Sequence, residues 1–186
     1  DPARLRPVFA QFGRMHLPKV LAAADAQRVA AALQRTPWSR TFLVDGKGYD
    51  VVREDYARTP DAVRQEVETA IARGGRTGFQ FDFDTYRISD VLEAGQRRGG
   101  DVAELEAVYD LLNSEPFLGF VRRLTGDARP VYCDAQATRY RAGQFLTFPV
   151  AESAQRNHQR RRPPFRIAGM PEARGGVPLQ PLRMRA

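Results

Sequence analysis

Residues 131–147 read VYCDAQATRYRAGQFLT, and this stretch decides the fold class that we expect. Its β-branched and aromatic residues predict strands over 131–133, 136–140 and 145–147. The segment Arg141-Ala142-Gly143 predicts the turn between the last two strands. Because helix patterns dominate the sequence before this stretch, we expect an α+β fold in which helices lead into strands.

A second strand pattern lies upstream, where Phe79, Phe81 and Phe83 alternate with polar residues. This alternation predicts a half-buried strand whose aromatic side belongs to the core. Asp82 and Asp84 point to the other side of that strand and are expected to form a solvated face. A pair of acids can also perform acid–base chemistry or bind a metal, so these functions stay open as the alternative.

Capping residues and apolar spacing predict the remaining elements. The Asp45-Gly46 pair predicts a hairpin turn between two strands, Thr41–Val44 and Tyr49–Val52. Helices are predicted over Ala26–Gln34 after an Asp25 cap, from Thr59-Pro60 to a stop at Gly74-Gly75, from Asp101 to Leu112, and from Ser114-Glu115-Pro116 to Gly126.

The charge and the composition change after Thr147. Residues 1–147 carry 21 basic and 20 acidic side chains, whereas residues 148–186 carry eight arginines and two glutamates. The second segment also holds six prolines and has no helix or strand periodicity. We therefore predict a domain over residues 1–147 and a disordered Arg/Pro-rich tail over residues 148–186.

The composition limits the cellular environments and the classes of partner that we expect. A single cysteine, Cys133, excludes an internal disulfide and a multi-cysteine zinc site, and as a lone strand cysteine it is expected to be a small buried hydrophobe. No apolar run is long enough for a membrane helix, and no secretory signal is recognised at Asp1-Pro2-Ala3. These features predict a soluble cytoplasmic protein without a membrane partner. The near-neutral charge of residues 1–147 argues against nucleic acid as a partner.

The run Ala137–Thr147, with Leu111–Phe117 and Arg123–Gly126 before it, resembles bacterial prolyl 4-hydroxylase-like oxygenases. Three upstream segments are similar to the helical N-terminal section of that family: Phe12–Pro18, Thr36–Trp38 and Gly78–Asp90. The resemblance covers roughly residues 9–147.

This resemblance implies a double-stranded β-helix, or jelly roll, of which residues 1–147 would be the incomplete N-terminal part. It implies an iron(II)- and 2-oxoglutarate-dependent dioxygenase that hydroxylates a prolyl-containing protein or a small molecule, with ascorbate as a further candidate cofactor. Two histidines and one carboxylate hold the iron in such enzymes. The family's tyrosine that lines the cosubstrate pocket corresponds to Tyr140, which is the one pocket residue that carries over.

The sequence departs from this family directly after Thr147. An His-x-Asp motif should follow, but the next residues are Phe148-Pro149-Val150-Ala151-Glu152, and no later strand supplies the second histidine. The chain has only two histidines, His16 and His158, in segments that are not expected to converge. We therefore predict no metal ligand, no catalytic residue and no turnover for this chain.

Two explanations of the tail stay open: a frameshifted or misassembled gene end, and a genuine divergent tail. The body uses 19 arginines against two lysines, which is typical of a GC-rich gene, and such a gene read in a wrong frame yields Arg, Pro, Ala and Gly. Two functional alternatives also stay open. One is a non-catalytic binding module, and the other is a nucleic-acid binder that acts through the arginines of residues 148–186.

Overall fold

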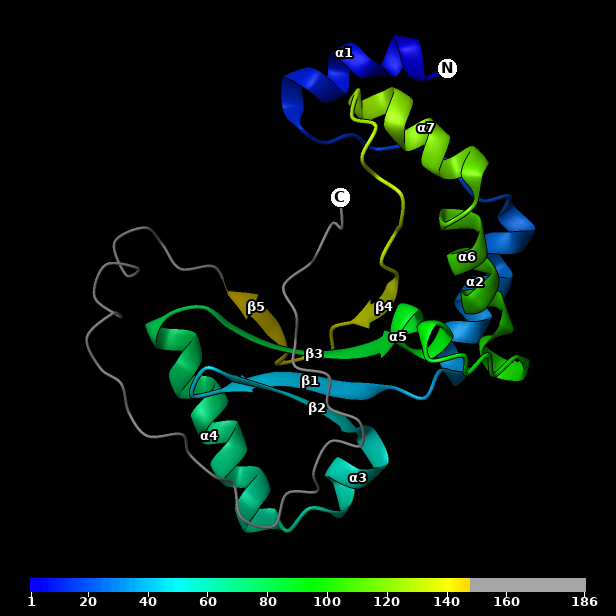
Figure 1. Cartoon of the computed structure of the whole chain (residues 1–186). Helices are drawn as coiled ribbons and strands as arrows, with labels where there is room; N and C mark the ends of the chain where they lie inside the picture. Colours follow the sequence, from blue (N-terminus) through cyan, green and yellow to red (C-terminus); the bar gives the residue numbers. More distant parts are fainter. Residues whose placement is uncertain (148–186) are drawn as a thin grey trace. The chain divides into compact units, whose positions relative to one another are not determined.

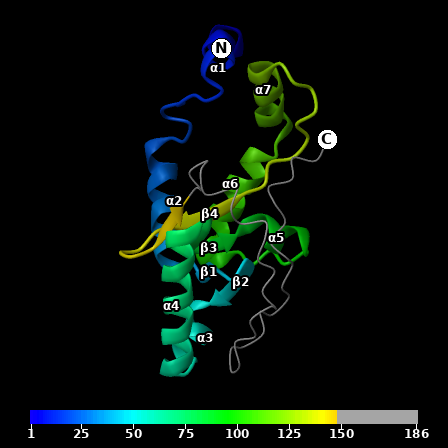
Figure 2. The same cartoon turned by 90° about the vertical axis from the view of Figure 1, so that its left-hand side faces the viewer.

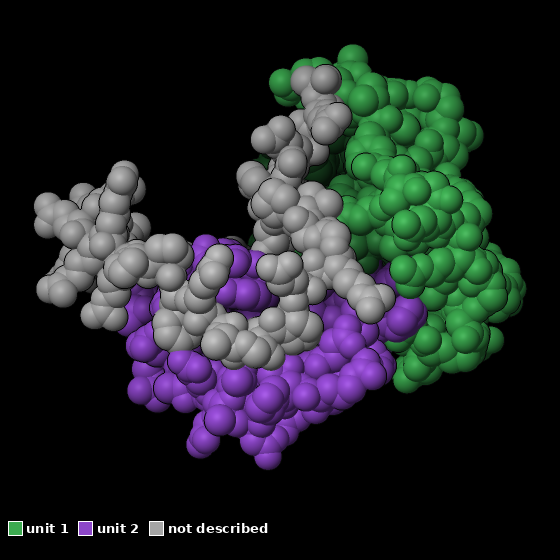
Figure 3. All heavy atoms as spheres, turned by 60° about the horizontal axis from the view of Figure 1, so that its bottom comes forward, with its two compact units in different colours: residues 1–36, 87–137, 181–186 green, residues 37–86, 138–180 purple. Residues whose placement is uncertain are grey.

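A computed structural model describes residues 1–147 of the chain. These residues form two compact units, coloured separately in Figure 3. Residues 1–36 and 87–137 belong to the first unit, and residues 37–86 and 138–147 belong to the second. The tail predicted for residues 148–186 lies outside the described residues.

The α+β class predicted from the sequence is confirmed (Figure 1). The helices of the described residues are α1 (Pro2–Phe12), α2 (Ala23–Arg35), α3 (Arg53–Arg58), α4 (Asp61–Thr77), α5 (Ile88–Glu93), the 3₁₀ turn η1 (Gly100–Val102), α6 (Ala103–Leu112) and α7 (Glu115–Thr125). The strands are β1 (Ser39–Val44), β2 (Lys47–Val52), β3 (Gln80–Arg87), β4 (Gln136–Arg139) and β5 (Phe145–Thr147).

The five strands form one sheet in the order β2-β1-β3-β4, and β5 also pairs with β3. The β1–β2, β1–β3 and β3–β5 pairs are antiparallel. Asp45 and Gly46 both have positive φ angles, 49° and 81°, as a tight hairpin turn requires, so the predicted turn is confirmed. Within residues 1–147 the sheet stays open and does not close into a barrel.

One face of this sheet is covered by α3 and α4 (Figures 1 and 2), and we call it the covered face. Antiparallel register places Arg40 opposite Asp84 and Phe42 opposite Asp82, so these four side chains share that face. The apolar core lies between the face and the two helices. Its buried members are Phe42, Val44, Val51, Tyr56, Val67, Ala70 and Ile71.

The predicted stop of the long helix at Gly74-Gly75 is wrong, because α4 continues to Thr77. A Cβ atom at Gly74 would lie 2.5 Å from Nε2 of Gln80, and one at Gly75 would lie 2.9 Å from the ring of Phe145. The two glycines therefore admit neighbouring side chains to the helix surface. They do not end the helix.

The strand predicted over 131–133 is also wrong, since this segment has no regular secondary structure. The Asn113 side chain accepts a hydrogen bond from the Cys133 amide at 2.8 Å and donates one to its carbonyl at 3.0 Å. An asparagine amide thus takes the two backbone groups that a neighbouring strand would otherwise bind.

Three predicted helix starts need correction, whereas one is confirmed. Asp25 lies in the first turn of α2, Thr59 precedes the Pro60 cap of α4, and Asp101 lies in η1 before α6. The α7 prediction is correct: the Ser114 hydroxyl accepts from the Phe117 amide, and Gly126 ends the helix with a φ of 74°.

Candidate functional site

Tyr140, the pocket residue named from the resemblance, directly follows β4 and has half of its surface exposed. Its ring centroid lies 5.7 Å from that of Phe83 on β3. The phenol is therefore held by an aromatic neighbour at one side and accessible at another. This arrangement leaves the side chain able to contact a ligand.

Tyr140 continues a row of rings along β3, which we call the aromatic face. Phe79 and Phe81 have centroids 5.8 Å apart, and Phe81 and Phe83 have centroids 5.6 Å apart. Phe81 is buried and Phe83 half-buried, as the core prediction requires, but Phe79 is 49% exposed. Leu146, opposite Phe81 in the register, is 40% exposed on the same face.

Asp82 and Asp84 are buried, so the prediction of a solvated acidic strand face is wrong. Their exposed fractions are 4% and 0%. Both lie on the covered face, where arginines from other elements neutralise them. Burial of a carboxylate is tolerated only with such partners, since an unpaired charge is costly to desolvate.

Arg40 of β1 joins Asp82 to the α4 residue Glu68. Its Nε and Nη2 atoms donate to the two carboxylate oxygens of Asp82 at 2.8 and 2.7 Å, and Nη2 also donates to Glu68 at 2.9 Å. The Tyr56 hydroxyl donates to Glu68 at 2.9 Å, and the Arg40 guanidinium lies 4.8 Å from the Tyr56 ring centre. Burial raises the pKa of Tyr56 to about 12, so this hydroxyl stays protonated as a donor.

Asp84 accepts hydrogen bonds from three arginines and one amide. Arg53 donates to Oδ1 at 2.9 Å, whereas Arg139 and Arg141 donate to Oδ2 at 2.8 and 2.9 Å. Gln144 donates to Oδ1 at 3.1 Å. Burial opposes ionisation of Asp84, but these hydrogen bonds outweigh it and lower its pKa to about 2.

These ion pairs keep Asp84 ionised, which does not suit a general acid or base. On the covered face, four arginines form ion pairs with three acids, so the cluster has a net charge of +1. The arginines are Arg40, Arg53, Arg139 and Arg141, and the acids are Glu68, Asp82 and Asp84. A general acid or base works best with a pKa near the operating pH, and the pKa of Asp84 lies far below it. The cluster is therefore an ionic support for the sheet, and we place no catalytic residue in it.

Within residues 1–147, the remaining side chains that could bind a metal do not converge. In the described part of the chain, no group of three or more His, Cys, Asp or Glu side chains is arranged to hold a metal ion. His16 is exposed in the link between α1 and α2, and His158 lies outside the described residues. Cys133 is half-buried, and burial raises the pKa of its thiol, with Asp134 adding to the effect.

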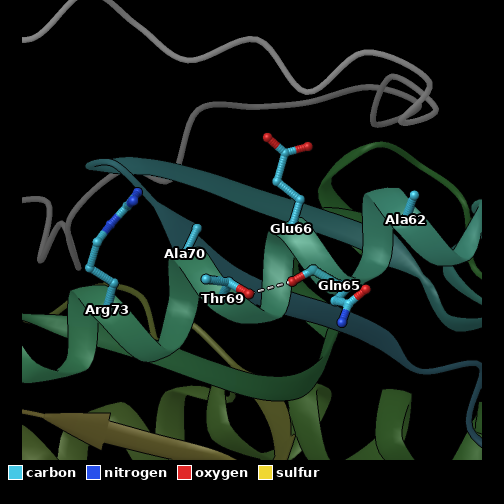
Figure 4. Close-up of a pocket in the computed structure, with 6 residues that line it drawn as sticks. All are labelled: Ala62, Gln65, Glu66, Thr69, Ala70 and Arg73. Carbon is cyan, nitrogen blue, oxygen red and sulfur yellow. Dashed lines mark hydrogen bonds between the residues drawn. The ribbon is translucent and has the colours of Figure 1, made fainter.

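A shallow hollow of about 370 Å³ lies along α4, and its lining residues do not include Tyr140. Figure 4 shows its lining side chains spread along this one helix, with a hydrogen bond of 2.8 Å from the Thr69 hydroxyl to the Gln65 carbonyl. Ligand sites bring polar groups together from several elements. Because the described lining comes from one helix, we assign no site to this hollow.

No family model, no curated protein and no solved structure matches the chain. Among the helices of residues 1–147, none has both the length and the apolar character that a membrane crossing demands.

Proposed function

We propose that this chain derives from an iron(II)- and 2-oxoglutarate-dependent dioxygenase of the prolyl 4-hydroxylase-like type, and that residues 136–147 belong to the wall of its cosubstrate pocket. The observation that carries the proposal is the position of Tyr140. The residue that the resemblance names as pocket-lining lies half-exposed beside Phe83, on the face that α4 does not cover.

The fold supports the same proposal at a coarser level. A jelly roll needs a second sheet against the inner face of the first, and the aromatic face offers partly exposed apolar side chains for such a contact. The helices α3 and α4 cover the other face, which would be the outside of the roll. The jelly roll itself and a cytoplasmic location belong to this proposal.

The described residues do not fit the metal of this family. They contain no ligand cluster, and the sequence after Thr147 has no His-x-Asp motif. We therefore derive no catalytic step through iron. What the chain offers is a phenol beside an apolar face, which would contact the cosubstrate in an intact relative. For this polypeptide we propose that turnover is absent.

The first experiment is to sequence the coding DNA from the Tyr140 codon onward and to translate all three frames. A frame that restores His-x-Asp after Thr147, with a later histidine and a basic residue, supports the oxygenase proposal and shows that the tail is an artefact. If no frame does so, the proposal fails for this gene. A non-catalytic binding module then becomes the better description.

A turnover assay tests the second half of the proposal. The purified chain, loaded with iron(II) and supplied with 2-oxoglutarate and ascorbate, is expected to release no succinate above a heat-denatured control. Succinate release that requires 2-oxoglutarate, and that Tyr140→Phe reduces, would contradict the expected inactivity.

A further inference from the structure

Tyr140 lies between two arginines that bind the same carboxylate oxygen. Arg139 Nη2 lies 2.8 Å from Asp84 Oδ2, and Arg141 Nε lies 2.9 Å from it. In extended backbone, successive side chains point to opposite sides, so residues two apart share a side and the one between them faces away. Binding of both arginines to Asp84 therefore directs Tyr140 to the opposite face.

The same alternation applies on β3, where Phe83 and Asp84 are neighbours. Asp84 lies on the covered face and accepts the two arginines, whereas Phe83 lies on the aromatic face and contacts the Tyr140 ring. The two segments therefore contact each other on both faces of the sheet. Arg139 and Arg141 bind Asp84 on the covered face, and Tyr140 contacts Phe83 on the aromatic face.

Pairing of β4 and β5 with β3 fixes the two ends of this segment, and side-chain bonds to Asp84 hold the part between them. Tyr140 lies beyond the end of β4, β5 has three residues, and the turn between them is exposed. Gln144 adds a hydrogen bond from the far side of the turn to Asp84 at 3.1 Å. Arg139 is packed at 4.3 Å from the ring centre of Trp38, which orients its guanidinium. Asp84 therefore binds side chains from both ends of the turn, Arg139 and Arg141 before it and Gln144 after it.

We propose that Asp84 is a positioning residue: it fixes Tyr140 on the aromatic face through Arg139 and Arg141. The ligand that Tyr140 would contact there, 2-oxoglutarate, rests on the proposed function above. The positioning itself rests only on the contacts described here.

The test is the ring contact between Tyr140 and Phe83, observed by NMR in the full chain with labelled tyrosine and phenylalanine. In Asp84→Asn, the cross-peak between these rings is expected to fall severalfold. The Phe42–Tyr49 stack, with centroids 5.4 Å apart in the same unit, is the internal control and is expected to persist. A merely structural role would weaken both ring contacts together.

A second variant covers the case in which Asp84→Asn does not fold. Arg141 is 55% exposed, so Arg141→Gln is expected to leave the fold intact and to reduce the Tyr140–Phe83 cross-peak partially. A cross-peak that stays at full strength in Arg141→Gln, or in a folded Asp84→Asn, would overturn the proposal. The cross-peak is measured without a cosubstrate. Failure of the oxygenase proposal would therefore leave this result unaffected.

Discussion

Replacement of Asp84 by asparagine removes a charge from the covered face and keeps the shape of the side chain. In the native protein this carboxylate is completely buried and bound by Arg53, Arg139 and Arg141. Asparagine can accept only part of those hydrogen bonds and attracts no guanidinium. We expect the variant to be less stable at neutral pH, and the loss to depend on pH in a defined way.

The magnitude follows from the pKa of Asp84, about 2 in the folded protein against 3.8 for an unperturbed carboxyl. This difference corresponds to about 2 kcal/mol of stability for the ionised group. A depressed folded-state pKa contributes its full stability above the unfolded value and loses it as the pH falls through the folded value. The contribution is therefore complete above about pH 5, reduced by about 1 kcal/mol at pH 3, and nearly gone at pH 2.

Urea unfolding followed by the fluorescence of Trp38, the single and buried tryptophan, measures this effect. The difference in unfolding free energy between the native chain and Asp84→Asn is expected to shrink by about 1 kcal/mol between pH 6 and pH 3. Asp110→Asn is the matched control, because Asp110 pairs with Arg97 at the surface. A native–variant difference that stays constant from pH 6 to pH 3 would refute the assignment of a depressed pKa to Asp84.

Three further predictions concern other buried contacts. Arg40→Met is expected to lower the unfolding free energy at pH 7 by about 3–5 kcal/mol, because it leaves the buried Asp82 carboxylate unpaired. Gly75→Ala is expected to destabilise the chain by about 1 kcal/mol in urea unfolding, because the new methyl group meets the ring of Phe145. Cys133 is expected to react with iodoacetamide at pH 8 more slowly than free cysteine, since burial raises its pKa, and urea is expected to restore the rate.

The two substitutions have matched controls. Arg97→Met removes an exposed pairing, which solvent screens, and is expected to lower the unfolding free energy far less than Arg40→Met does. Gly119→Ala lies inside α7 near the flexible end of Arg123, so it is expected to stabilise the chain by up to about 1 kcal/mol. A stabilising Gly75→Ala, an Arg40→Met as mild as Arg97→Met, or native Cys133 that reacts like the free amino acid would contradict the respective contact.

Local signals predict some elements correctly but misplace three helix starts, at Asp25, Thr59 and Asp101. The Asp45-Gly46 turn and the Ser114-to-Gly126 helix depend on caps and positive φ angles within a few residues, and both predictions are confirmed. The errors at Gly74-Gly75 and at residues 131–133 arise from tertiary contacts. Nothing in the neighbouring sequence indicates that Gly75 packs against Phe145, or that Asn113 binds the backbone of Cys133.

For the candidate site, too, the sequence predicts one part correctly and another part wrongly. Alternation along residues 79–84 correctly places the phenylalanines and the aspartates on opposite sides of one strand, but it does not tell which side a helix covers. The expected arrangement has the acids facing water and the phenylalanines facing the core. The protein buries the acids fully and the phenylalanines only in part, because arginines from β1, the start of α3 and the β4–β5 segment supply the opposite charges.

A signal for this pairing does exist in the sequence, although no single strand contains it. Asp82 and Asp84 are two residues apart on one strand, and Arg139 and Arg141 are two residues apart where β4 ends. Like charges at this spacing share a side of the chain, so two segments with opposite charges at matching spacing can bind through one face. That reading predicts where Tyr140 must point without reference to any family. It also accounts for the placement of Tyr140 between Arg139 and Arg141: the two arginines bind Asp84 on the covered face, and the phenol between them lies on the aromatic face beside Phe83.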